Sequence, residues 1–144
     1  MNATTVEQGQ YLLKIGVDKE TADVLYYGRI ADEDGNVLAE PQFDMFLKRP
    51  GMPDTKIVGW SLEALFAQMP TVTTCKGMYV PTLMTYVDTV DGKIVTKYYC
   101  CYQREDKNGE VHQLYSAFSE KPIDCVYESL TWALRNKPRI EQKD

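Results

Sequence analysis

The chain has 144 residues, of which 44% are apolar and 26% charged, so its size and composition suit one soluble globular domain over residues 1–144. A formal charge of −5, with Lys and Arg scattered along the chain, argues against a binder of nucleic acid or of an anionic membrane, which needs a basic face. No signal peptide is recognisable and no apolar run approaches the ~18 residues of a membrane span, so we expect a cytoplasmic protein with reduced cysteines.

Two short helices are predicted at the start of the chain. The segment TTVEQ (residues 4–8) contains both a Thr-x-x-Glu and a Thr-x-x-Gln pattern, either of which forms a capping box for a helix that Gly16 ends. Asp18 can cap a second helix over residues 19–27, and Gly28 would stop it.

A hairpin and a further helix are predicted next. The polar segment DEDGN separates residues 29–31 from residues 37–47, which indicates two strands joined by a loop. After a loop rich in proline and glycine, the segment GWSLEALFAQMP predicts a helix over residues 61–69. Ser61 is its cap, and the proline that follows stops it.

The last predicted element is a helix over about residues 122–136. Pro122 suits its first position, because a proline lacks the N–H group that has no partner there anyway. Lys137-Pro138 is expected to end it. Apolar residues recur at steps of three and four and form a stripe that can pack on a sheet: Ile123, Val126, Tyr127, Leu130 and Leu134.

Two hairpin signals determine the middle of the chain. Asp91-Gly92 and Asn108-Gly109 are dipeptides typical of two-residue hairpin loops. They predict three antiparallel strands, at about residues 80–90, 93–104 and 110–118. The expected fold class is therefore α+β: an antiparallel meander over about 80–118, packed against the C-terminal helix and accompanied by further short helices.

Counting outward from these two loops predicts the register of the meander. Leu83 should pair with Cys100, Cys100 with Ala117, and Glu105 with His112. Alternate side chains then lie on opposite faces, and one face is almost free of charge and is predicted to be core. Its residues are Leu83, Thr85, Val87, Ile94, Thr96, Tyr98, Cys100, Tyr102, Tyr115 and Ala117.

The adjacent thiols of Cys100 and Cys101 are predicted to point to opposite faces of the sheet, Cys100 toward the core. A disulfide between them fits badly, because their Cα atoms are ~3.8 Å apart in an extended chain and disulfides span roughly 4.4–6.8 Å. A metal site would need both sulfurs on one side. We therefore expect no cofactor and no metal.

An enzyme based on a thiol is an alternative with few residues to support it. His112 is the only histidine, and it would have to act with Cys125 or Cys101. Cys125 lies in the first turns of the last helix, where the helix dipole lowers a thiol pKa, but Asp124 beside it has the opposite effect. No set of catalytic residues is visible in the sequence.

The other face of the meander carries charged residues together with a group of large apolar side chains. Either a helix covers this group, or it is a contact surface for another chain. We therefore expect a non-enzymatic binding protein with a protein partner, or a homodimer. A small-molecule-binding domain, with a pocket between sheet and helices, is the alternative. The candidate interaction surface consists of Met84, Tyr86, Tyr99, Leu114 and Phe118.

Three stretches of the chain carry a resemblance: ETADVLYY, WSLEALFAQMP and KPIDCVYESLTWALRNK. In this pattern the chain resembles a set of small uncharacterised proteins from gut bacteria and their phages. The matching stretches cover about a quarter of the chain, and none is a catalytic signature. The resemblance implies an accessory protein of a phage or mobile element, and it carries over no activity.

Overall fold

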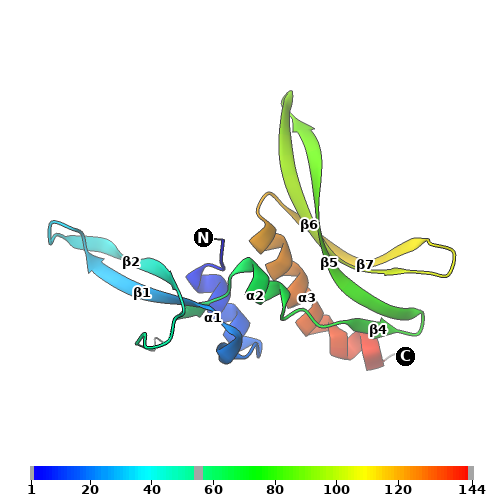
Figure 1. The fold of residues 1–144 in the computed structure, drawn as a ribbon, viewed down its shortest axis with the longest axis horizontal. Coiled ribbons are helices and arrows are strands. Elements are labelled where there is room, and N and C mark those ends of the chain that lie inside the picture. Colours follow the sequence, from blue (N-terminus) through cyan, green and yellow to red (C-terminus); the bar gives the residue numbers. More distant parts are fainter. Residues whose placement is uncertain (1, 54–56, 143–144) are drawn as a thin grey trace. The chain divides into compact units, whose positions relative to one another are not determined.

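The computed structural model describes residues 2–53 and 57–142. The chain divides into two compact units, residues 1–64 and residues 65–144. Each unit contains one antiparallel sheet, and the two sheets hold seven strands within the described residues (Figure 1). Short helices and one long C-terminal helix complete the fold, which confirms the α+β class. That residues 1–144 form a single domain stays a prediction.

The first unit begins with the helix α1 (Val6–Lys14), and its predicted capping box is confirmed. The Thr5 side chain accepts a hydrogen bond from the Gln8 amide at 3.1 Å, and the Gln8 side chain accepts one from the Thr5 amide at 3.0 Å. A sheet with strand order β2-β1-β3 follows. Its strands are β1 (Val24–Ala31), β2 (Val37–Leu47) and β3 (Val58–Gly59).

The prediction of a helix over residues 19–27 is wrong. Only a single 3-10 turn, Lys19–Thr21, follows the Asp18 cap, and β1 begins at Val24. The segment Val24–Tyr26 is buried on both sides in the central strand of the sheet, between β2 and β3. Strand pairing and burial outweigh the local capping signal here, because β-branched and aromatic residues pack well in a pleated strand.

The core of the first unit gathers around Trp60, which is fully buried. The Trp60 amide donates to the Thr4 hydroxyl at 3.1 Å, and its indole N–H donates to the Thr21 hydroxyl at 3.0 Å. Helix α1 contacts β3 so closely that a Cβ atom on Gly9 would lie 2.5 Å from the Val58 carbonyl oxygen. Glycine therefore permits this approach of helix to strand.

The helix predicted over residues 61–69 forms, but it is shorter than expected. Helix α2 (Leu62–Phe66) starts after Ser61, whose hydroxyl accepts a hydrogen bond from the Ala64 amide at 3.3 Å. The same hydroxyl donates to the Asp23 carboxylate at 2.5 Å, which ties the cap to the residue before β1. After Phe66 the backbone forms tighter turns, since the amide of Met69 bonds the carbonyl of Phe66 three residues before it.

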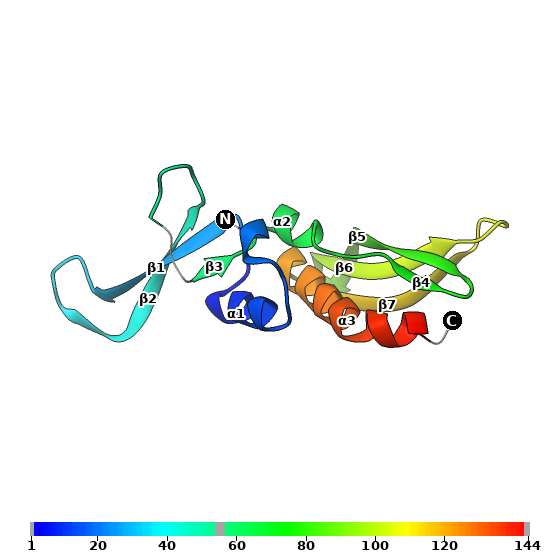
Figure 2. The same ribbon diagram turned by 90° about the horizontal axis from the view of Figure 1, so that it is seen from below.

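The second unit contains the predicted meander, with one additional strand before it. The four strands pair in the order β4-β5-β6-β7. Helix α3 packs on one face of this sheet (Figure 2). The bounds of these elements are β4 (Val72–Thr74), β5 (Gly77–Val90), β6 (Lys93–Glu105), β7 (Val111–Ser119) and α3 (Pro122–Gln142).

The predicted register is confirmed in the first hairpin and in the centre of the second. Leu83 pairs with Cys100, and Cys100 pairs with Ala117. The predicted pairing of Glu105 with His112 is wrong: Glu105 pairs with Val111, and Arg104 pairs with His112. The second loop has three residues instead of two, and a β-bulge between Tyr102 and Gln103 restores the predicted register beyond it.

Helix α3 starts at Pro122 as predicted, but the expected end at Lys137-Pro138 is wrong. The helix continues through Pro138 to Gln142. The Lys137 ammonium donates to the Thr71 carbonyl at 2.7 Å and to the Glu141 carboxylate at 2.9 Å, and Glu141 accepts the Thr73 amide at 2.9 Å. These contacts hold the last turns against β4, which offsets the hydrogen bond that a proline removes.

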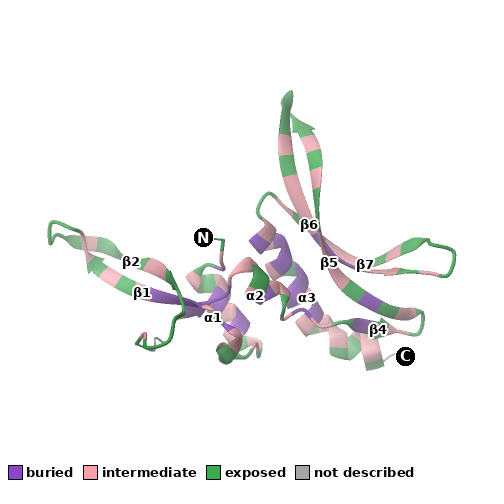
Figure 3. Cartoon of the chain, in the orientation of Figure 1, coloured by how far each residue is buried: buried purple, intermediate pink, exposed green. Residues whose placement is uncertain are grey.

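The predicted core face is buried only where α3 covers it. Cys100, Tyr102 and Ala117 are buried beneath the helix, and the Ser129 hydroxyl bonds the Cys100 carbonyl at 2.8 Å. The hairpin of β5 and β6 extends beyond α3, and there Val87 is 67% and Ile94 78% exposed (Figure 3). Thr85 and Thr96 are exposed as well, so the prediction that this face is core along its whole length is wrong.

Candidate functional site

A cluster of large side chains spans β5, β6 and β7 on the sheet face opposite to α3. Strand pairing places Met84 beside Tyr99 and Tyr99 beside Phe118. The rings of Tyr99 and Phe118 are stacked, with centroids 5.5 Å apart, and Tyr86 contacts both at 5.8 and 6.1 Å. The Tyr99 hydroxyl lies 2.9 Å from the Met84 sulfur. These four residues are called the aromatic cluster below.

The aromatic cluster is accessible. Phe118 is 60% exposed and Met84 is 41% exposed, whereas Tyr86 and Tyr99 are half-buried against them. Helix α3 packs on the other face, where Ser129 and Trp132 contact the sheet. Within residues 65–142 of this unit no helix covers the cluster, so the unit leaves a connected group of aromatic rings at its surface.

Leu114 belongs to the predicted interaction surface, but it lies apart from the cluster. It is the extra residue of the β-bulge, because Gln113 and Tyr115 are paired with β6 and Leu114 is not. Phe118 lies four positions further along β7, which is roughly 13 Å along a strand. Leu114 is half-buried. Because of this bulge, simple alternation of side chains along β7 wrongly included Leu114 in the predicted surface.

The rim of the aromatic cluster is polar and carries a balanced pair of charges. At the hairpin end the Lys97 ammonium contacts the Asp88 carboxylate at 3.2 Å. The hydrogen bond from Lys97 lowers the pKa of Asp88 and, reciprocally, raises the pKa of Lys97. At the other end the Ser116 hydroxyl donates to the Gln113 side chain at 2.8 Å. The ion pair itself is neutral, and Glu120 also lies near enough to Lys97 to raise its pKa.

The cysteines are free, and three of the four are buried. Cys100 and Cys101 lie on opposite faces: the Cys100 sulfur is 3.7 Å from the Met69 sulfur, and the Cys101 sulfur is 3.5 Å from the Gln103 side-chain oxygen. Burial raises the pKa of the Cys100 thiol to about 12 and that of the Cys125 thiol to about 11. Burial also raises the pKa of Cys101. Few thiolate groups therefore form at these three buried cysteines at neutral pH.

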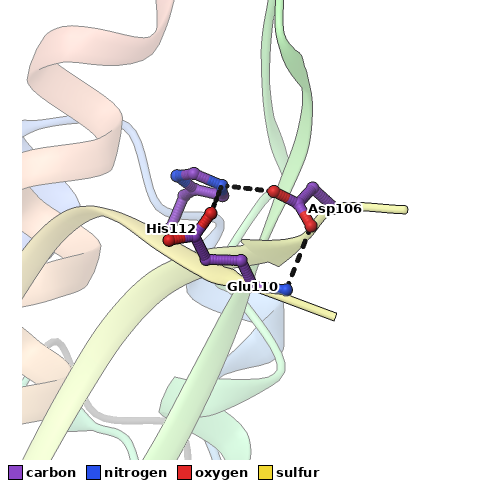
Figure 4. A group of neighbouring side chains, drawn as sticks. All are labelled: Asp106, Glu110 and His112. Carbon is purple, nitrogen blue, oxygen red and sulfur yellow. Dashed lines mark hydrogen bonds and ion pairs between the residues drawn. The ribbon is translucent and has the colours of Figure 1, made fainter. Parts of the chain in front are cut away.

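The structure places His112 with carboxylates and not with a thiol. Its Nε2 atom lies 2.8 Å from Asp106 and 4.0 Å from Glu110, at the loop between β6 and β7 (Figure 4). The three-residue loop and the register it sets bring His112 to the face of Asp106, opposite to the face of Cys101. His112 therefore faces Asp106 and not Cys101, and the Cys125 thiol donates to the Pro122 carbonyl at 3.2 Å.

The group of Asp106, Glu110 and His112 was missed in the sequence, because its assembly depends on the loop length. Its ligand atoms lie within 4.8 Å of one another. The hydrogen bond from His112 lowers the pKa of Asp106, and the Glu110 and Asn108 amides, which bond the same carboxylate, act in the same direction. Every one of these contacts stabilises the loop, so we assign the group a structural role.

Comparisons with known proteins add no family to this description. No family model matches the chain, and no match is found among curated proteins or solved structures. The resemblance to small proteins of gut bacteria and their phages therefore stays a prediction. Among the helices of residues 2–53 and 57–142, none has the length and apolar character required to cross a membrane.

Proposed function

We propose that the chain is a non-enzymatic binding protein whose aromatic cluster is the contact surface for another protein chain. The observation that carries the proposal is Phe118 of the edge strand β7, which is 60% exposed and stacked on Tyr99 of the neighbouring strand β6. Aromatic side chains at a surface supply large contact area with few rotatable bonds, and tyrosine adds a polar end. The raised pKa values of the buried thiols favour binding over thiol chemistry.

The face of the sheet is a better contact surface than its edges. Strand β4, at one edge, has only three residues, and the neighbouring stretch of β5 carries Pro81, which cannot donate to a partner strand. Strand β7, at the other edge, is interrupted by the bulge at Leu114. Short strands, prolines and bulges are features that disfavour pairing with another strand. We therefore assign the contact to the side chains of the cluster.

The partner that we propose is a second copy of the chain. Residues 65–144 contain ten Lys and Arg and ten Asp and Glu, so two copies of this unit do not repel each other through net charge. A two-fold contact places the same patch on both copies, and Asp88 and Lys97 at the rim offer one charge of each sign to the other copy. The chain is then a homodimer built on the aromatic cluster.

Light scattering after size exclusion tests this proposal over roughly 1–100 µM protein. The wild-type chain is expected at twice its 16.5 kDa mass, and Phe118→Ser is expected at the monomer mass. Val111→Ser is the matched control, because Val111 is an exposed apolar residue of the same strand outside the cluster. A wild-type monomer at every concentration, or a Phe118→Ser variant that remains a dimer, would contradict the proposal.

A further inference from the structure

A second candidate site lies wholly within the first unit and is independent of the aromatic cluster. A cavity of about 200 Å³ is bounded by the 3-10 turn, by β1 and β3, and by the loop that follows β2. This volume is below the roughly 300–1,000 Å³ of pockets for drug-sized ligands. Its occupant must therefore be a small molecule or the end of a larger one.

Positive charge is concentrated at this cavity. Lys19, Lys48 and Arg49 line it, against a single acid, Glu20. Residues 1–64 contain only six Lys and Arg and eleven Asp and Glu, so half of the unit's cations meet in an otherwise acidic unit. Among the described residues none of the three cationic side chains has an ion-pair or hydrogen-bond partner. Internal ion pairing does not account for their convergence.

Apolar side chains form the remainder of the wall. Leu25 and Val58 are buried in the sheet beneath the cavity, and Met52 closes it from the loop. A neighbouring hollow of about 480 Å³ shares Arg49 and Met52 with it, and is otherwise lined by apolar residues of β2. The cavity thus combines cations at its rim with apolar surface at its floor.

Two hydrogen bonds tie the loop that carries two of the three cations to β1 and to the residue before β1. The Lys48 amide donates to the Asp23 carbonyl at 2.7 Å, and the Tyr27 hydroxyl donates to the Pro53 carbonyl at 3.1 Å. Within the loop, the Met52 amide bonds the Arg49 carbonyl at 3.3 Å. These bonds keep the backbone of the rim close to the floor without using the cationic groups.

We propose that this cavity binds a small organic anion, a carboxylate or phosphate that carries a short apolar group. The anionic head contacts Lys48, Lys19 and Arg49, whose guanidinium can bond two oxygens at once. The apolar group lies against Leu25, Val58 and Met52. Because the cations are partly solvated, the expected dissociation constant is on the order of 1 mM.

Amide chemical-shift titrations of the full chain test this assignment, with phenyl phosphate, benzoate, inorganic phosphate and benzyl alcohol as probes. At least one of the two aromatic anions is expected to give saturable shifts at Leu25, Met52 and Val58, and comparing them identifies the preferred head group. Benzyl alcohol, which lacks the charge, and inorganic phosphate, which lacks the apolar group, are each expected to bind at least about fivefold more weakly.

Two variants distinguish specific binding in the cavity from non-specific attraction of the anion to positive charge. Arg49→Gln is expected to weaken binding of the aromatic anion about fivefold. Lys14→Gln removes the same charge from the exposed end of α1, outside the cavity, and is expected to leave binding unchanged. Unchanged amide shifts away from the cavity verify that both variants are folded.

Three results would overturn the assignment. They are an absence of saturable shifts up to about 50 mM of either aromatic anion, shifts centred away from the cavity, and equal losses in Arg49→Gln and Lys14→Gln. Phe118→Ser is expected to retain anion binding, because Phe118 belongs to the other unit. Failure of dimerisation therefore leaves this result intact, and failure of anion binding leaves the aromatic cluster intact.

Discussion

Trp132 of α3 stacks on Tyr115 of β7, with ring centroids 4.5 Å apart and ring planes inclined by only 5°. The same indole contacts the ring of the buried Tyr102 at 5.7 Å. Tyr102 in turn donates its hydroxyl hydrogen bond to the Pro70 carbonyl at 2.8 Å. Trp132 therefore joins the helix to two strands, and through Tyr102 to the segment that precedes β4.

Replacement of Trp132 tests whether this contact holds the helix on the sheet. Trp132→Ala is expected to lower the free energy of unfolding by about 3 kcal/mol, because it removes a large packed side chain and its stacking on Tyr115. Trp132→Phe retains a ring on Tyr115 and is expected to cost less than about 1.5 kcal/mol. Urea unfolding followed by circular dichroism measures both, and equal losses in the two variants would contradict the stacking role.

The thiols predict a selective labelling pattern. Cys75 is exposed, and the other three cysteines are buried with pKa values raised by burial. Iodoacetamide at neutral pH is therefore expected to label Cys75 in the native chain and all four residues in denaturant. Peptide mass spectrometry reads the sites. Fast native labelling of Cys125 or Cys101 would revive the thiol-enzyme alternative.

Asp106 predicts a pH dependence of stability. Its pKa in the folded chain lies below the 3.8 of an unperturbed carboxyl, chiefly because His112 donates a hydrogen bond to it. The carboxylate therefore stabilises the fold at pH values above 3.8, and this contribution is lost as the pH falls through the lowered pKa. Asp106→Asn keeps an oxygen for the loop amides but removes the charge, so stability should fall less between about pH 5 and pH 2.

Urea unfolding at a series of pH values measures this difference. Asp91→Asn is the matched control, because it removes a carboxylate from the other hairpin loop of the sheet, where asparagine also accepts the left-handed backbone with φ 52°. Its acid sensitivity should resemble that of the wild type. An acid sensitivity of Asp106→Asn equal to that of Asp91→Asn would show that the His112 contact adds nothing to stability.

Replacement of Gly9 by alanine is expected to change stability in the direction opposite to that usual for a glycine in a helix. In an exposed helix position, Gly→Ala gains about 1 kcal/mol of stability. At Gly9 the added Cβ would lie 2.5 Å from the Val58 carbonyl oxygen, so Gly9→Ala is expected to destabilise the first unit by about 1–3 kcal/mol. Gln10→Ala, at the next and exposed position of α1, serves as the control. Thermal unfolding distinguishes the two, and a stabilised Gly9→Ala variant would contradict this close approach.

The sequence alone was sufficient to predict features in which a few neighbouring residues set the backbone conformation. Asp91-Gly92 adopts the left-handed conformations that a two-residue hairpin requires, and the predicted register of that hairpin follows. The Thr5 capping box and the helix start at Pro122 are likewise local. The opposite directions of Cys100 and Cys101 follow from the alternation of any extended strand.

The aromatic cluster was only partly predictable. Alternation and register correctly placed Met84, Tyr86, Tyr99 and Phe118 beside one another, since these positions depend only on strand pairing. The bulge at Leu114 was not visible, because it compensates for a loop one residue longer than Asn108-Gly109 suggests. The same longer loop moved His112 to Asp106, so the carboxylate–histidine group escaped prediction.

Only the tertiary structure decided which of the apolar segments are buried. Val24–Tyr26 follows a helix cap, yet it forms a central strand because β2 and β3 pair with it on both sides. Val87 and Ile94 alternate like core residues, yet they remain exposed because α3 ends its contact with the sheet before reaching them. A sequence thus favours turns, caps and alternation through bonds between near neighbours, but Asn108-Gly109 and Asp18 show that these signals do not fix the length of a loop or a helix. Burial and the contacts of side chains distant in sequence depend on which elements the fold brings together.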